Sequence, residues 1–68
     1  MELSARNQIR GRVTSVTLGT VMAEVSIEIG AGQTIVSTIS LASVERMKIR
    51  VGDAVTAIIK ATEVLVGK

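Results

Sequence analysis

Apolar side chains occupy every second position of one segment of this chain, residues 20–29. They are Val21, Ala23, Val25, Ile27 and Ile29. Successive side chains of a β-strand point to opposite faces of the sheet, so the pattern predicts a strand with one buried and one solvated face. An α-helix would need a period of about 3.6 residues instead. This segment is the clearest strand in the sequence.

Glycines mark the turns on both sides of this strand. The segment 17–20 contains Gly19 and predicts a turn before the strand. Gly30-Ala31-Gly32 predicts a hairpin after it, because glycine tolerates the positive φ values of tight connections. The segment 33–40 then predicts a third strand that is partly apolar on both sides, so one side could face another subunit.

The segment 6–17 predicts the first strand, which should be strongly bent. Its apolar positions alternate at Ile9, Gly11 and Val13, but Val16 falls out of this phase. An extra residue in a strand shifts the alternation in this way and bends the strand. A β-bulge is therefore expected where the phase changes.

After the third strand the period becomes that of a helix. Leu41, Val44 and Met47 recur at helical spacing, and Ser40 or Ser43 can cap the amides at the start. The sequence predicts a short helix of about two turns here.

A turn at Gly52-Asp53, a strand over 55–60 and a last strand at Glu63–Val66 complete the chain. Five short strands with one helix between the third and the fourth is the order of the OB-type barrel, a partly open Greek-key sheet. We therefore expect an all-β fold, an OB-like five-stranded Greek-key barrel with one short helix.

The residue content limits the chemistry that the chain can perform. The 68 residues include no cysteine and no histidine, which excludes thiolate metal sites, thiol nucleophiles and the commonest general base. The carboxylates are scattered, which argues against an acid–base pair and against a metal-cation site. We expect one domain, residues 1–68, that is not an enzyme and for which no organic cofactor is implied.

Hydrophobic residues make up 47% of the chain, more than so small a monomer can bury, so we expect a homo-oligomer. The N-terminus lacks the pattern of a signal peptide. No apolar run approaches the roughly 20 residues that span a bilayer. The sequence therefore predicts a cytoplasmic protein with no membrane partner.

Two segments near the ends of the chain indicate an anion site. Ser4-Ala5-Arg6-Asn7-Gln8 and Ile59-Lys60-Ala61-Thr62-Glu63 each contain one cation among small or uncharged neighbours. Arg6 offers a planar fork of donors and Lys60 a compact point charge, and Glu63 is the only carboxylate within three residues of either. Such a pair of cations favours an oxyanion as its ligand.

Two other functions remain as alternatives. An OB-type fold and a pI near 9.7 also fit an OB-type nucleic-acid-binding module. Such modules stack bases on aromatic rings, however, and the chain contains no Phe, Tyr or Trp. Nucleic acid is therefore the weaker hypothesis. A purely structural oligomer without a ligand is the third.

Four segments cover nearly the whole chain: SARNQIRGRV, GTVMAEVSIEI, ISLASVERMKIRVGD and VTAIIKATEV. In their order and spacing they resemble the molbindins, the Mop family of small molybdate-binding proteins. The resemblance implies a Mop domain that binds molybdate, and usually tungstate, inside the cell, for storage or buffering in molybdenum homeostasis. It also implies a homohexamer, a trimer of dimers, with the oxyanions held at subunit interfaces.

Carried over by motif, the resemblance implies a main interfacial site made by six residues. They are Ser4, Ala5, Arg6, Ser40, Lys60 and Ala61. Asn7, Met22 and Ala23 are further candidates, for additional sites near the symmetry axes.

Molybdate is a tetrahedral dianion that only accepts hydrogen bonds, so its pocket should present only donors. Hydroxyls, cations and backbone amides of these residues meet that need, and Glu63 should point away. Ala42 stands where many family members have an aspartate, so the helix cap should be weaker or move to Ser40. A Ser40 that caps the helix would be less available to the ligand.

Overall fold

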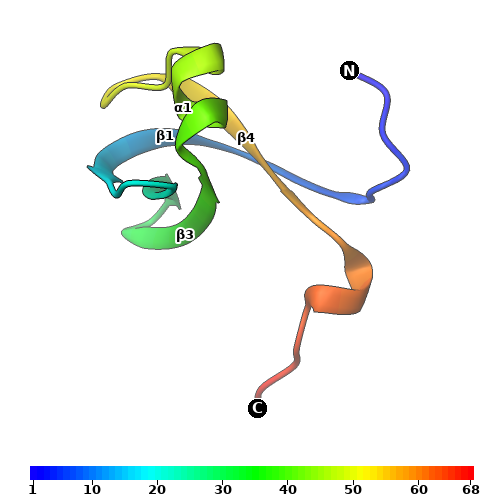
Figure 1. Cartoon of the computed structure of the whole chain (residues 1–68). Helices are drawn as coiled ribbons and strands as arrows, with labels where there is room; N and C mark the ends of the chain where they lie inside the picture. The colour runs from blue at the N-terminus through cyan, green and yellow to red at the C-terminus, as the bar shows by residue number, and fades with distance from the viewer.

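The computed structural model describes residues 1–68, which build one antiparallel sheet of four strands and a short helix (Figure 1). The elements in chain order are β1 (Asn7–Leu18), β2 (Met22–Gly30), β3 (Gln33–Ser40), α1 (Leu41–Met47), β4 (Ala54–Ile59) and the 3₁₀ turn η1 (Ala61–Glu63). The strand order is β3-β2-β1-β4. The fourth strand thus returns beside the first, as in a Greek key. The predicted all-β class and the helix between the third and fourth strands are confirmed.

The predicted fifth strand, Glu63–Val66, is corrected by the structure. Its first residue closes η1, where the Glu63 amide donates to the Lys60 carbonyl over 2.9 Å. The following residues have no regular structure, and Leu65 and Val66 are 92% and 93% exposed. A strand needs a partner to satisfy its backbone, and this segment has none within its own chain. The chain therefore forms an open four-stranded sheet with β3 and β4 as its edges.

The expected bulge lies in β1. Val13 pairs with Ile27 and Ser15 with Ser26, so Thr14 is the extra residue. This insertion explains the changed phase of Val16, which turns toward the interior again after the bulge. Before the bulge β1 pairs with β4, and from Arg12 onward it pairs with β2.

The β2–β3 hairpin is the tightest connection in the fold. Gly30 pairs with Gln33, so Ala31 and Gly32 form a two-residue loop. Both loop residues have positive φ, 53° and 74°. These values are typical of a type I′ turn, whose twist matches that of the flanking strands. The predicted hairpin is confirmed.

The core lies on the concave side of the sheet under α1. Six residues are buried: Val13, Ala23, Val25, Ile27, Val44 and Ala57. Three of them come from β2 at alternate positions, as the alternation predicted. Val44 is the one buried residue of α1, and it anchors the helix on the sheet.

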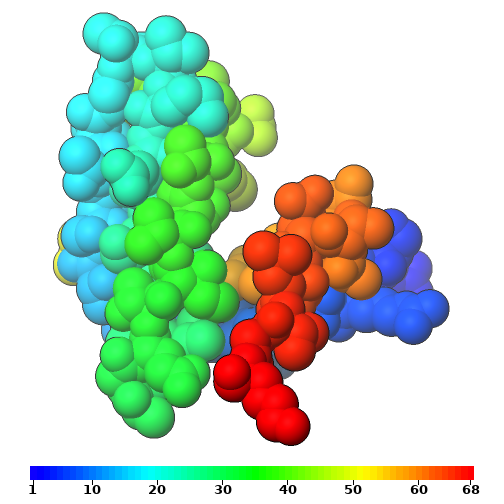
Figure 2. Space-filling model, turned by 90° about the horizontal axis from the view of Figure 1, so that it is seen from below, coloured from blue at the N-terminus to red at the C-terminus, as the bar shows by residue number.

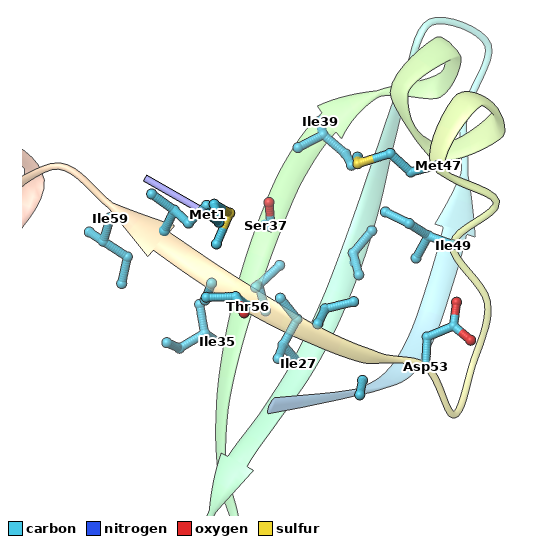
Figure 3. Close-up of a pocket in the computed structure, with 16 residues that line it drawn as sticks. Met1, Ile27, Ile35, Ser37, Ile39, Met47, Ile49, Asp53, Thr56 and Ile59 are labelled. Atoms are coloured by element: carbon cyan, nitrogen blue, oxygen red, sulfur yellow. The ribbon is translucent and has the colours of Figure 1, made fainter. Parts of the chain in front are cut away.

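The open side of the sheet leaves an apolar groove between β3 and β4. Its volume is about 780 Å³, and 13 of its 16 lining residues are hydrophobic. Figure 3 shows Ile27 of β2, Ile35 of β3 and Ile59 of β4 among the side chains that line this groove. In Figure 2 the C-terminal residues, in orange and red, stand beside the body formed by β2 and β3.

Candidate functional site

The register of β1 and β4 brings the two predicted cationic segments together. The last pair of this ladder is Asn7 with Ile59. Arg6 directly precedes that pair and Lys60 directly follows it. The segments that carry Ser4–Arg6 and Lys60–Ala61 therefore leave the sheet at the same end, although more than fifty residues separate them in the sequence.

The backbone amides at this end of the ladder are free to donate. Those of Ser4, Ala5, Arg6, Lys60 and Ala61 make no hydrogen bond with another backbone group of the chain. For Ala61 the reason is its position, because the first amides of a helical turn have no partner within that turn. These amides and the two cations are therefore the hydrogen-bond donors available at this end of the ladder.

The two cations of this set are exposed to solvent. Arg6 and Lys60 both lie on the surface, and the side-chain hydrogen bonds of the structure engage neither. Arg12 is the one cationic residue whose side chain is engaged, through its Nη1 to the Gly52 carbonyl over 2.6 Å. Exposed donors of this kind can contact only one side of an anion. A second surface is needed to satisfy the oxygens on its other side.

Ser40, Met22 and Ala23 form a separate group at the far end of β2 and β3. Ser40 pairs with Met22, and Ala23 is the next residue of β2. Figure 1 shows this end beside the start of α1, on the side of the molecule away from η1. One chain therefore does not bring Ser40 to Arg6 and Lys60.

The side chains of this second group are largely engaged in the fold. The Ser40 Oγ caps α1 by accepting from the Ser43 amide over 3.1 Å, and it donates to the Ser43 Oγ over 2.8 Å. Ala23 is buried in the core, with 2% of its surface exposed, so only its backbone could meet a ligand. Met22 is half exposed. Of the two serines that the sequence offered as caps, Ser40 and Ser43, the structure uses Ser40.

Two amide side chains support the cationic end of the ladder. Asn7 donates through Nδ2 to the Ile59 carbonyl over 3.2 Å, so its nitrogen is used within the fold. Gln8 donates through Nε2 to the Ala5 carbonyl over 3.0 Å. Gln8 was not among the predicted site residues, and no pattern in the sequence indicates its contact with the Ala5 carbonyl.

The groove between β3 and β4 is the wrong environment for a dianion. Its lining is mostly hydrophobic, and neither Arg6 nor Lys60 belongs to it.

No group of three or more acidic, histidine or cysteine side chains could hold a metal ion. None of the helices has the length and apolar character required to cross a membrane. The free donors at the end of the β1–β4 ladder are therefore the candidate site.

Comparisons with known proteins identify the family to which the chain belongs. Residues 3–66 match the family model of the TOBE domain. The chain is 51% identical over 67 residues to a probable molybdenum-pterin-binding protein of Haemophilus influenzae, covering 98% of this chain and 97% of that protein. Its fold is similar to that of MopII from Clostridium pasteurianum, with a TM-score of 0.91 at 43% identity over 98% of this chain and all of the other. It is also similar to a molybdate-binding protein from Sporomusa ovata, with a TM-score of 0.93 at 38% identity over the full length of both.

Proposed function

Because this chain belongs to the TOBE-domain family, and to its small molybdenum-pterin-binding members, we propose that it binds molybdate as a free oxyanion between the subunits of a homo-oligomer. Tungstate, a tetrahedral dianion of almost the same size, is expected to bind at the same place. A pocket of ordinary hydrogen bonds cannot separate the two ions well. Related proteins of known structure are described as molybdate-binding, which supports this choice of ligand.

The observation that carries the proposal is that Arg6 and Lys60 flank the last pair of the β1–β4 ladder, next to backbone amides that have no backbone partner. A tetrahedral dianion accepts hydrogen bonds through all of its oxygens and donates none, so a site of this kind suits it. Charge-assisted hydrogen bonds from a guanidinium and an ammonium are the strongest that side chains offer. The alanines at positions 5 and 61 let the anion approach the backbone closely.

We propose that the site is completed by another copy of the chain. Ser40 lies at the opposite end of the sheet from Lys60, so a pocket that uses both takes them from different subunits. Only 6 of the 68 residues are buried, and the groove between β3 and β4 is open and apolar. Assembly would cover this surface. A homohexamer arranged as a trimer of dimers is the assembly that we expect, with one Mop domain in each subunit.

The role that we propose is the storage or buffering of molybdate in the cytoplasm. Catalysis is not part of it, since the relatives are described as binding proteins and the chain has neither histidine nor cysteine. No organic cofactor and no nucleic acid are needed. The absence of aromatic residues removes the stacking surface that single-stranded nucleic acid requires.

Calorimetric titration of the purified protein with sodium molybdate tests the proposal, with the mass of the assembly recorded in the same buffer. We expect saturable binding that an excess of sulfate or phosphate does not displace, because these ions are smaller. Molybdate should also raise the melting temperature, since a ligand that binds only the folded state stabilises it by mass action. The absence of both heat and stabilisation would contradict the proposal.

A further inference from the structure

Two side-chain amides hold the two halves of the candidate site in the same way. Asn7 donates to the carbonyl of Ile59, and Gln8 donates to the carbonyl of Ala5. Each of these carbonyls belongs to the residue directly before a site cation, Lys60 in the first case and Arg6 in the second. In both segments, therefore, a side-chain amide donates to the carbonyl that precedes a site cation.

The geometry of the peptide bond makes these contacts act on the site. All peptide bonds of the chain are trans, so each amide N–H points away from the carbonyl of the preceding residue. The Ile59 carbonyl points toward Asn7 of β1, so the Lys60 amide points away from β1, and the contact from Asn7 Nδ2 helps to hold it in that direction. Gln8 does the same for the amide of Arg6 through the Ala5 carbonyl. Both of these amides lack a partner in the chain.

We propose that Asn7 and Gln8 are positioning residues, which hold the backbone amides of Lys60 and Arg6 in fixed directions toward the oxyanions bound between subunits. The inference rests on the proposed function and adds residues that determine how well the site distinguishes between anions. It also revises the role expected for Asn7, whose side-chain nitrogen is engaged by Ile59 and is not presented to a ligand. Neither residue needs to contact the anion itself.

Discrimination between oxyanions should depend on this arrangement. Molybdate and sulfate have the same shape and charge and differ in size, so donors must be held at one spacing to prefer the larger ion. A donor that is free to move adapts to either ion. Loss of the side-chain amides should therefore reduce the ratio of molybdate to sulfate affinity, in addition to the affinity for molybdate.

The test uses the full-length protein in its assembled state, with Asn7→Ala and Gln8→Ala compared with the wild type. The control is Thr14→Ala, which removes a side-chain hydrogen bond from the same strand to the Ser26 carbonyl, remote from the site. We expect each site variant to weaken molybdate binding about five- to tenfold, the effect of losing one ordinary hydrogen bond. The control should change it by less than about twofold.

Two further measurements separate positioning from a general loss of stability. The molybdate-to-sulfate ratio should fall in both site variants and stay constant in the control. In ¹⁵N spectra of the wild type, the Lys60 and Arg6 amides should shift when molybdate is added; the Lys60 shift should shrink in Asn7→Ala and the Arg6 shift in Gln8→Ala. Gln8 is exposed and its contact lies outside the β1–β4 ladder, so Gln8→Ala remains informative even if Asn7→Ala folds poorly.

The outcomes distinguish this inference from the proposed function. Site variants that keep the wild-type affinity and selectivity would overturn the positioning role while the wild type still binds molybdate. A lower melting temperature with unchanged selectivity would also overturn it, because that is the result of a merely structural contact. Failure of the wild type to bind molybdate would instead refute the proposed function itself.

Discussion

Arg6 and Lys60 carry the full positive charges of the proposed site, and both project into solvent. An exposed side chain contributes little to packing, so its removal should affect the ligand and not the fold. The loss of one charge-assisted hydrogen bond, about 1.5–3 kcal/mol, corresponds to a decrease in affinity of about ten- to a hundredfold.

We therefore predict that Lys60→Ala loses most of the molybdate affinity and keeps the mass of the assembly. Titration calorimetry and light scattering measure these two properties. Arg46→Ala is the matched control, because Arg46 is an exposed cation in the last turn of α1, away from the site. Equal affinities for the two variants would exclude Lys60 from the site.

Gly11 of β1 lies in close contact with β2. A Cβ at this position would lie 2.6 Å from the Glu28 carbonyl oxygen, and it would also meet a methyl group of Ile27. The bent strand crosses close to β2 here, and the backbone cannot move aside easily.

We predict that Gly11→Ala lowers the free energy of unfolding by about 1–3 kcal/mol, the usual cost of overpacking. Denaturant unfolding of the two proteins measures the difference. Gly67→Ala provides the comparison, since a Cβ there would meet nothing within 4 Å. A Gly11→Ala protein as stable as Gly67→Ala would mean that β1 adapts without strain.

At the scale of the elements, local signals predicted most of the fold correctly. The alternation in β2, the glycines of its hairpin, the phase change in β1 and the serine before α1 each describe a few neighbouring residues. The segment Glu63–Val66 has strand-like residues as well, yet it forms no strand, because a strand also depends on a partner that the chain does not supply. Local patterns carry no information about that partner.

The candidate site was predictable only in part for the same reason. Arg6 and Lys60 were named from their neighbours, but their place at the same end of the sheet depends on the register of β1 and β4, a contact between distant parts of the sequence. The role of Gln8 depends on the direction of a single carbonyl, which residue types do not specify. Ser40 was named as both a cap and a ligand, and the structure shows it as a cap.

The cap of α1 yields a prediction for this element. The helix has seven residues and one buried side chain, so it depends on its N-terminal hydrogen bond more than a longer helix would. Ser40→Ala should lower the free energy of unfolding by about 1 kcal/mol. Chemical denaturation monitored by circular dichroism measures it. Thr38→Ala, an exposed change in β3, serves as control, and equal stability of both variants would show that the cap is dispensable.

At the scale of the whole molecule, apolar surface remains without cover. The groove between β3 and β4 is open, and Leu65 and Val66 extend from the chain fully exposed to solvent. The homo-oligomer proposed above would cover this surface. The C-terminal residues are therefore expected to take part in the assembly.

We predict that Leu65→Asp reduces the mass of the assembly, because a carboxylate would have to be buried where an apolar side chain is proposed to pack. Analytical ultracentrifugation across a range of concentrations measures the change. Lys68→Asp introduces the same group farther along the exposed segment and should leave the mass unaltered. Identical masses for both variants would place Leu65 outside the contact.

The open groove has a consequence for how much anion the protein can hold. If each subunit is stable only when its neighbours cover this surface, dilution will dissociate and unfold the chains together, and the unfolding midpoint will rise with protein concentration. A site shared between subunits then disappears at low abundance, even when its ligand is plentiful. The amount of anion that a cell can hold would then rise more than twofold when the number of chains doubles. Below a threshold concentration of chains, almost no anion would be bound.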